Sequence, residues 1–340
     1  MGEVYLAEHE GLQRHVALKR FAFKETEGDD EDTARERFYR EGQALARLNH
    51  QNVVCVHDLF EWRKQTYMVL EYVDGFDLSK LLSEGACPVD VACLLALGAT
   101  RALEAAHAVG IVHRDVKASN VMLSRRGEVK LMDFGIARQD LLEPMTRTGL
   151  VVGTPRYVAP EVVKGGTADA RSDVYGVGAL LYFALSGQRL FSEAKQENLF
   201  HLILTGKYRP IGRVARHVPR DMRRIVRRCL DRIPARRYAS ASELASALEA
   251  FLIRHDLGSD NRARLVAFLK DRGHFSEAEA DEWQVPSASS AEPEEMPAPS
   301  RSWWMLWAGA SAAAVFLVAD AVWFGLLGRA LELLTSQLVR

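Results

Sequence analysis

Four side chains in this sequence, Asp115, Lys117, Asn120 and Asp133, are of the types that transfer of a phosphoryl group requires. A carboxylate can accept the proton of a hydroxyl group, and a lysine can neutralise the charge that moves with the phosphoryl group. Carboxylate and amide oxygens are ligands that Mg²⁺ takes together with phosphate oxygens. Because no single residue could do this chemistry, the prediction requires that the fold bring all four together.

These residues belong to short motifs that follow one another in a fixed order. The motifs are His-Arg-Asp at 113–115, Asp-Phe-Gly at 133–135 and Ala-Pro-Glu at 159–161. An isolated aspartate before glycine would most simply be a turn, but here it follows a strand-like run and lies downstream of the first motif. The set resembles the eukaryotic-type Ser/Thr protein kinases of bacteria, over most of residues 2–255.

The resemblance implies a role for each of the four residues. Asp115 would accept the proton of the substrate hydroxyl, and Lys117 would contact the γ-phosphate of ATP. Asn120 and Asp133 would hold Mg²⁺, with Mn²⁺ as the other cation that the family allows. A lysine two residues after the catalytic aspartate is typical of Ser/Thr kinases, so the expected substrates are protein serine and threonine hydroxyls.

A second group of residues resembles the nucleotide-binding strand of the same family. The run Val-Ala-Leu-Lys at 16–19 would place Lys19 on the α- and β-phosphates and Ala17 beside the nucleotide. Glu41, on the helix that follows, is the expected ion-pair partner of Lys19, and Glu36 ranks second. Taken alone, Lys19 would be a solvated strand lysine and Glu41 a surface charge.

The run at 69–75 resembles the hinge between the two lobes of a kinase. Backbone groups of Glu71 and Val73 would then bind adenine, and Asp77 occupies the position of an acid that often contacts the ribose. The residues themselves describe only the end of a buried strand and a turn, so the ribose role of Asp77 stays open.

The glycine-rich loop departs from the family pattern. Of the pattern G-x-G-x-x-G-x-V, the chain matches only the last glycine, Gly2, and the valine, Val4. We expect a truncation inside this loop, at an internal methionine, because the catalytic and metal-binding residues are intact. A catalytically impaired pseudokinase or a membrane-tethered binding scaffold is the alternative. A small-molecule phosphotransferase ranks third, because the motifs at 153–155 and 159–161 resemble a peptide-substrate platform.

Two threonines, Thr146 and Thr148, lie between the second and third motifs. A Thr-x-Thr at this position is autophosphorylated in related bacterial kinases, and Arg114 could bind the added phosphate. The resemblance therefore predicts activation by phosphorylation, although threonines are common in loops.

Three further features concern the second half of the chain. Asp173 resembles the acid that braces the catalytic loop, residues 113–120, and Arg237 resembles the arginine that pairs with Glu161. The arginine-rich stretch 209–237 could attract acidic partners or an anionic membrane leaflet. Its amphipathic spacing favours a solvated helix face.

Hydrophobic periodicity predicts a small β-rich lobe followed by a larger helical one, and the resemblance implies that together they form an α+β, two-lobed protein-kinase fold. The small lobe, 1–72, would lack its first strand, and the larger helical lobe would span 73–255. Expected strands are 3–8, 15–21, 53–60 and 67–72, and expected helices are 31–48, 89–109, 172–186, 220–230 and 241–255.

Beyond the predicted kinase domain, 1–255, the composition changes. A helical extension (256–283), a Pro/Ser/Glu-rich linker (284–302), an apolar run (303–327) and a short outer tail (328–340) follow one another. The apolar run is long enough for one transmembrane helix, although Asp320 within it is costly to insert. We expect a single-pass protein of the cytoplasmic membrane with a cytosolic kinase domain. Tethering would favour trans-autophosphorylation, for which a homodimer is one arrangement.

Bulk composition narrows the choice of partners. The formal net charge is −1 and charged residues make up 26% of the chain, so overall charge does not point to nucleic acid as a partner. The 4 cysteines are scattered without metal-ligand spacing, as in proteins of reducing compartments. The N-terminus has neither the basic start nor the apolar run of a signal peptide.

Overall fold

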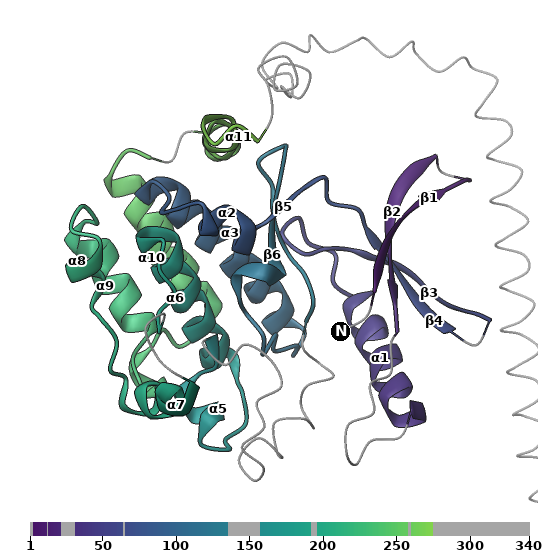
Figure 1. The fold of residues 1–340 in the computed structure, drawn as a ribbon, viewed down its shortest axis with the longest axis horizontal. Coiled ribbons are helices and arrows are strands. Elements are labelled where there is room, and N and C mark those ends of the chain that lie inside the picture. The colour runs from purple at the N-terminus through teal and green to yellow at the C-terminus, as the bar shows by residue number, and fades with distance from the viewer. Residues whose placement is uncertain are drawn as a thin grey trace, which may run out of the picture. The chain divides into compact units, whose positions relative to one another are not determined.

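The smaller lobe is a four-stranded antiparallel sheet with one helix against it (Figure 1). Its strands are β1 (Val4–His9), β2 (Arg14–Arg20), β3 (Val56–Trp62) and β4 (Gln65–Glu71), in the order β1-β2-β4-β3. The computed structural model describes residues 3–11, 13–21, 31–63, 65–134, 157–191, 196–257 and 260–274, with the backbone alone at 31–34, 37, 41, 196 and 197.

Helix α1 (Glu31–Leu45) packs on the sheet through a short apolar face. Phe38, Gly42 and Leu45 are buried there. A Cβ atom on Gly42 would lie 3.0 Å from the terminal methyl of Met68 and 3.3 Å from a methyl of Leu59. The absence of a side chain at Gly42 therefore lets the helix approach β3 and β4 closely.

The larger lobe is built around two long helices, α3 (Val89–Ala108) and α6 (Ala170–Ser186), which pack against each other. The other helices are α2 (Leu78–Ser83), α5 (Pro160–Val163), α7 (Gln196–Thr205), α8 (Ile211–Val214), α9 (Arg220–Cys229), α10 (Ala241–Arg254) and α11 (Asn261–Asp271). Short 3₁₀ turns lie at η1 (Ala118–Asn120) and η4 (Pro234–Arg236). A small antiparallel sheet, β5 (Gly75–Asp77), β6 (Val121–Ser124) and β7 (Val129–Leu131), lies at the side that faces the smaller lobe (Figure 1).

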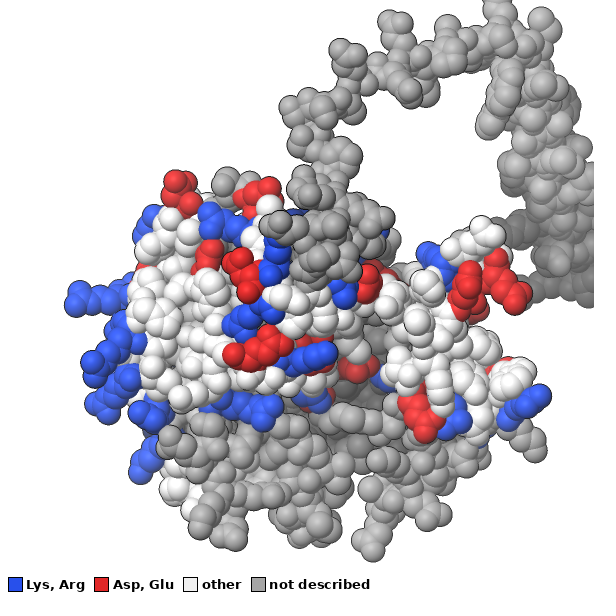
Figure 2. All heavy atoms as spheres, turned by 45° about the horizontal axis from the view of Figure 1, so that its top comes forward, with Lys and Arg blue, Asp and Glu red and all other residues white. Residues whose placement is uncertain are grey.

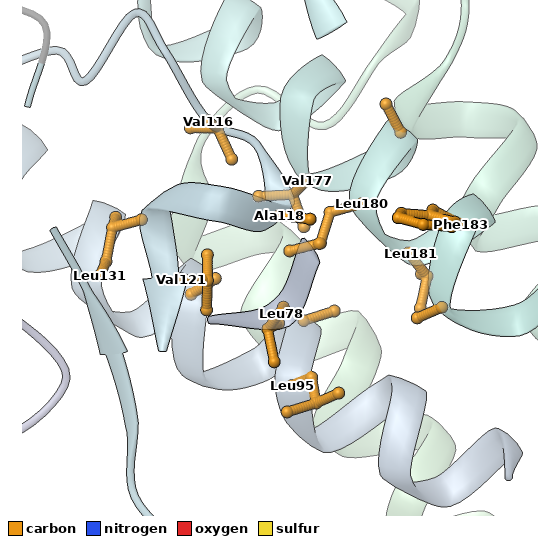
Figure 3. Close-up of a cluster of buried hydrophobic side chains, with 14 of the residues drawn as sticks. Leu78, Leu95, Val116, Ala118, Val121, Leu131, Val177, Leu180, Leu181 and Phe183 are labelled. Carbon is orange, nitrogen blue, oxygen red and sulfur yellow. The ribbon is translucent and has the colours of Figure 1, made fainter. Parts of the chain in front are cut away.

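Helix α6 is apolar on nearly all sides, as expected of a helix at the centre of a lobe. It begins at a capping box on Asp169 and ends at Gly187, whose φ of 66° is the left-handed conformation that favours glycine. Figure 3 shows Val177 and Leu180 of this helix beside Val116 and Ala118, which precede η1 and begin it. The main hydrophobic core therefore extends directly beneath the loop that carries Asp115.

The predicted two-lobed architecture, with a β-sheet lobe and a helical lobe, is confirmed. The predicted helix 31–48 ends at Leu45, and the predicted strand 53–60 begins only at Val56. The preceding residues pair with the other lobe instead, because Val54 N donates to Leu131 O at 3.0 Å. The sequence reading missed α2, α7, α8 and β5, which are short or lack a clear apolar period.

The predicted helical extension contains α11, which packs on α3. Arg272, at its end, donates to the carbonyl oxygens of Leu81, Gly85 and Ala86. The predicted linker, transmembrane helix and outer tail lie outside the described residues. Within the part of the chain that the structure describes, no helix is both long and apolar enough to cross a membrane.

Candidate active site

The catalytic loop brings Asp115, Lys117 and Asn120 into direct contact. Lys117 Nζ donates to Asp115 Oδ2 at 2.7 Å. Asn120 Nδ2 donates to the backbone oxygen of Asp115 at 2.8 Å and to its Oδ2 at 3.1 Å. Two donors therefore hold the same carboxylate oxygen, which fixes the orientation of the Asp115 side chain.

Asp133 lies next to this loop and is joined to the smaller lobe. The backbone N–H of Met132 donates to the carbonyl oxygen of Asn120 at 2.9 Å, which places Asp133 beside the loop. Lys19 Nζ, from β2, lies 2.7 Å from Asp133 Oδ1. Residues 114 positions apart in the sequence thus meet at one place.

Two of the five non-glycine residues that have a positive φ in the described part of the chain lie at the same place. Asp133 has a φ of 55° and Arg114 a φ of 66°, which is the left-handed region that side chains disfavour. Such conformations persist only where the surrounding structure over-determines them, and they cluster at functional sites.

The buried carboxylate of Asp173, in α6, supplies that constraint. Its Oδ2 accepts a hydrogen bond from the backbone N–H of His113, and its Oδ1 accepts one from the N–H of Arg114, both at 2.8 Å. His107 Nε2, from α3, lies 2.8 Å from the same Oδ2. Asp173 therefore ties the catalytic loop to the two central helices, as predicted.

His113 has a structural role that the sequence analysis did not assign. Burial lowers the pKa of this fully buried imidazole, so the ring is neutral. Its Nε2 lies 3.1 Å from Met132 O and its Nδ1 accepts from the N–H of Asp115 at 3.2 Å. These contacts define one tautomer, protonated at Nε2, that joins the catalytic loop to the segment before Asp133.

One face of the sheet is directed towards this centre. Side chains alternate along β2, so Lys19 and Ala17 share a face. The strand register sets Val4 opposite Lys19 and Leu70 opposite Ala17, which adds both to that face. Val4 is 58% exposed, so it presents apolar surface beside the lysine. Gly2 lies outside the described residues.

The helix partner of Lys19 is only partly defined. Glu41 lies in α1 as expected, but its side chain lies outside the described part of the structure. Glu36, the second-ranked partner, is an exposed residue whose Oε1 is 2.5 Å from Arg40 Nη2. The assignment of Glu41 stays a prediction, and the contact made by Glu36 gives no support to the alternative.

The predicted hinge follows β4. The side chain of Glu71 is engaged by Lys130 at 2.6 Å and by the N–H of Cys55 at 3.1 Å, which anchors the end of the strand. Among the described residues, no backbone hydrogen bond involves Val73, so its N–H and carbonyl fit the adenine role. Asp77 caps α2 by accepting from Lys80 N at 3.0 Å, a structural role that the sequence analysis did not foresee.

The Glu161–Arg237 pair forms as predicted. Arg237 Nη1 and Nη2 each lie 2.7 Å from one oxygen of Glu161, and the Arg237 side chain is fully buried. Burial alone would raise the pKa of Glu161, but the hydrogen bond and charge of Arg237 outweigh it and lower that pKa. The pair fixes the end of the segment that contains Thr146 and Thr148, which themselves lie outside the described residues.

The sequence is similar to those of known protein kinases. The sequence profile described as "Protein kinase domain" matches residues 1–248. The serine/threonine-protein kinase PksC of Streptomyces coelicolor is 40% identical over 255 residues, which cover 72% of this chain and 45% of PksC. The tyrosine-protein kinase MasK of Myxococcus xanthus is 33% identical over 293 residues, which cover 82% of this chain and 44% of MasK. The chain thus matches less than half the length of either relative.

A solved structure shares the fold. The crystal structure of the Mycobacterium tuberculosis PknI kinase domain matches with a TM-score of 0.58 and 29% sequence identity. The match covers 74% of this chain and 91% of the PknI domain.

Proposed function

This chain belongs to the protein kinase family, and we propose on that basis that it transfers the γ-phosphoryl group of ATP to serine and threonine hydroxyl groups of other proteins. The contact between Lys19 Nζ and Asp133 Oδ1 carries the proposal. It joins the sheet that would cover the nucleotide to the aspartate that would hold its metal ion. Residues from the two lobes would therefore serve one active site. A single matching motif in the sequence would not by itself predict such a contact between the lobes.

Asp115 would accept the proton of the attacking hydroxyl group. Lys117 and Asn120 hold one of its oxygens, so the carboxylate is oriented before a substrate arrives. Lys117 lies beside that carboxylate, so it belongs to the same site. The positive charge of Lys117 would act there on the γ-phosphate. Orientation and electrostatic stabilisation supply most of the catalysis in this class of reaction.

Asn120 and Asp133 would hold Mg²⁺ or Mn²⁺. One amide oxygen and one carboxylate fit a hard divalent cation that completes its coordination with nucleotide phosphates and water. When bound, the cation would neutralise charge on the β- and γ-phosphates. The backbone of Glu71 and Val73 would bind adenine, and Asp77 would have to combine its capping role with a contact to the ribose.

Transfer to serine and threonine, as opposed to tyrosine, rests on Lys117 and on relatives such as PksC, which is named a serine/threonine-protein kinase. MasK, which is named a tyrosine-protein kinase, makes a direct test necessary. After incubation with radiolabelled ATP and a generic protein substrate, phosphoamino-acid analysis should find phosphoserine and phosphothreonine. Phosphotyrosine as the main product would overturn this assignment.

The Asp115→Asn protein is the control for transfer itself. It should bind Mg-ATP but incorporate almost no phosphate. If the unaltered chain also binds nucleotide without transferring phosphate, the chain is a binding scaffold and the proposed activity is wrong.

We further propose that phosphorylation of Thr146 and Thr148 activates the enzyme. A phosphate carries nearly two negative charges, and Arg114 beside the catalytic aspartate is the cation placed to bind it. Replacing both threonines by alanine should lower activity, whereas full activity in the phosphate-free enzyme would argue against the switch.

We also propose that residues 303–327 anchor the chain in the cytoplasmic membrane as a single helix. The full chain should then appear in the membrane fraction of lysed cells, and a chain ending at residue 302 should not. Recovery of both chains in the same fraction would refute the anchor.

A further inference from the structure

A cavity formed by described residues lies away from the active site, between α8, α9 and the segment before them. It measures about 540 Å³, and five of the residues that line it are arginines. We call it the arginine pocket, and its arginines are Arg213, Arg220, Arg223, Arg224 and Arg227. In Figure 2, blue side chains gather at the left edge of the molecule, on the side where Figure 1 places α8 and α9.

The acidic residue of α9 is paired with residues outside the pocket. Asp221 is the acidic residue of α9, and its Oδ2 is engaged by His255 at 2.8 Å and by Arg254 at 3.4 Å, both on or next to α10. Among the described residues, no ion pair involves Arg213, Arg220, Arg224 or Arg227. Three of these arginines occupy positions 220, 224 and 227 on α9, so like charges stack on one face of the helix.

One arginine of the pocket is held in place by the backbone. Arg223 Nε donates to Val218 O and its Nη2 donates to Arg216 O, both at 2.6 Å. A Cβ atom on Gly212 would lie 2.8 Å from Arg223 Nη1, so a side chain at position 212 would require the guanidinium to shift. The exposed side chains of Arg220, Arg224 and Arg227 agree with the predicted solvated helix face, whereas Arg223 is partly buried and bonded to the backbone.

The pocket also has an apolar floor. Ile211 and Val226 are buried, and Tyr208 lines the same cavity. Burial raises the pKa of Tyr208 to about 12, so its hydroxyl group stays neutral. A concave site with apolar walls and guanidinium groups accepts a side chain that enters it, whereas a flat lipid surface would reach only the rim.

We propose that the arginine pocket binds a phosphorylated serine or threonine side chain on a protein substrate. A phosphate group has nearly two negative charges and three strong acceptor oxygens in one compact group, so several guanidinium forks can share it. An acidic peptide carries its charges on separate carboxylate side chains, and each of these would have to enter the cavity on its own. A single phosphate group is therefore the better match to the cavity. The proposal rests on the proposed function in one respect, since that activity produces phosphorylated serine and threonine side chains. Binding of such a side chain in the arginine pocket would keep a protein substrate bound for further phosphorylation.

Binding is tested with the full chain carrying Asp115→Asn, so that turnover cannot alter the probe. The probe is a labelled peptide with one phosphoserine between apolar residues, measured by fluorescence anisotropy. It should bind on the order of tenfold more tightly than the same peptide with serine or with glutamate. Reversing two pocket charges, Arg220→Glu with Arg224→Glu, should weaken binding by at least the same order.

Two further variants separate the pocket from general charge effects. Arg236→Glu reverses an exposed charge of the same arginine-rich stretch outside the pocket, and the phosphopeptide affinity should stay within about twofold. Arg224→Lys keeps the charge but loses the planar fork, and an intermediate loss is expected. Circular dichroism of each variant checks that the fold is intact.

Three outcomes would overturn the proposal. Equal affinity for the glutamate peptide would make the pocket a general acidic docking site. Binding of phosphatidylglycerol vesicles, abolished by the double reversal while the phosphopeptide does not bind, would make it a membrane contact. Phosphopeptide binding that survives the double reversal would place the site elsewhere. Phosphate transfer by the chain with Asp115 intact is assayed separately, so failure of catalysis would refute the proposed function and leave the docking result standing.

Discussion

The two lobes support the active site in different ways. In the larger lobe, Asp173 is 1% exposed, holds the catalytic loop with two short hydrogen bonds and contacts His107 of α3 with a third. In the smaller lobe, the ion pair of Lys19 with Asp133 joins side chains that are 19% and 37% exposed, and Val4 beside Lys19 is 58% exposed. The catalytic loop is therefore fixed by the interior of the protein, whereas the sheet side presents surface that a nucleotide would cover.

This difference separates residues that matter for stability from residues that matter for turnover. Buried, fully bonded groups lose much free energy when a partner is removed, and partly exposed pairs lose little. Changes in the larger lobe should affect both folding and activity, and changes on the sheet side should affect activity with little effect on folding. We expect Asp115 to be the exception in the larger lobe, because the proposed function gives its side chain a role in the reaction.

The largest effect is expected at Asp115. The Asp115→Asn protein should transfer phosphate about 10² to 10⁴ times more slowly, because the group that accepts the proton is lost while its shape is kept. Initial rates with radiolabelled ATP measure this. The thermal unfolding midpoint should change little, and a large drop in that midpoint would show that Asp115 belongs with the structural residues.

Removal of Arg237 should have the largest effect on stability. Arg237→Ala leaves Glu161 partly buried without its partner, which costs about 3–5 kcal/mol. Arg228→Ala is the matched control, since Arg228 Nη2 lies 2.6 Å from Glu243 on the surface and such pairs contribute about 0–1 kcal/mol. Urea unfolding gives both values. A similar loss in the two variants would contradict the distinction between buried and exposed pairs.

The Glu161–Arg237 pair should also give stability a pH dependence. Arg237 lowers the pKa of Glu161 below its ordinary value of 4.5, so the unfolded chain binds the proton first as pH falls. The stability from this group is present above about pH 4.5 and is lost as the pH falls through the folded-state pKa. Urea midpoints measured from pH 6 downwards should fall less steeply for Glu161→Gln than for the unaltered chain; parallel curves would refute this.

The sequence predicted the catalytic loop well because its parts are local. Asp115, Lys117 and Asn120 of this loop are close neighbours in the sequence. Their side chains therefore come into contact once the loop forms. The contact of Lys19 with Asp133 spans 114 positions, and only the resemblance to a family could place these two together. No periodicity or spacing in the sequence contains that information.

The features that the sequence did not reveal depend on the path of the backbone. The resemblance left a ribose role of Asp77 open, and it gave no sign that the helix directly after Asp77 uses it as a cap. In the sequence, Arg223 cannot be distinguished from the other arginines of a polar helix face. Its position is fixed by backbone carbonyl oxygens of the segment before α9, and these leave no side-chain pattern. The docking of Arg272 on the α2 region depends in the same way on carbonyls that no side-chain pattern marks.

A smaller effect on stability is expected at Lys19. Lys19→Met removes the ion pair with Asp133 but keeps the side-chain length, and a partly exposed pair contributes about 0–1 kcal/mol. Phosphate transfer should nevertheless fall sharply, since the charge that would hold the α- and β-phosphates is gone. Paired measurements of unfolding and of initial rate test this. A loss of stability as large as that of Arg237→Ala would mean that the sheet side is also fixed by the protein interior.

The smallest effect is expected at Val4, and it tests which face of β1 meets the nucleotide. Val4→Ala removes apolar surface on the face shared with Lys19, so the KM for ATP should rise by a few-fold, in keeping with about 0.8 kcal/mol for each buried CH₂ group. Tyr5→Ala is the matched control, because neighbouring strand residues point to opposite faces and Tyr5 is also exposed. The control should leave the KM for ATP within about twofold. If Tyr5→Ala raises the KM and Val4→Ala does not, the nucleotide does not lie against the face that carries Lys19, and the sheet side of the site has been assigned to the wrong surface.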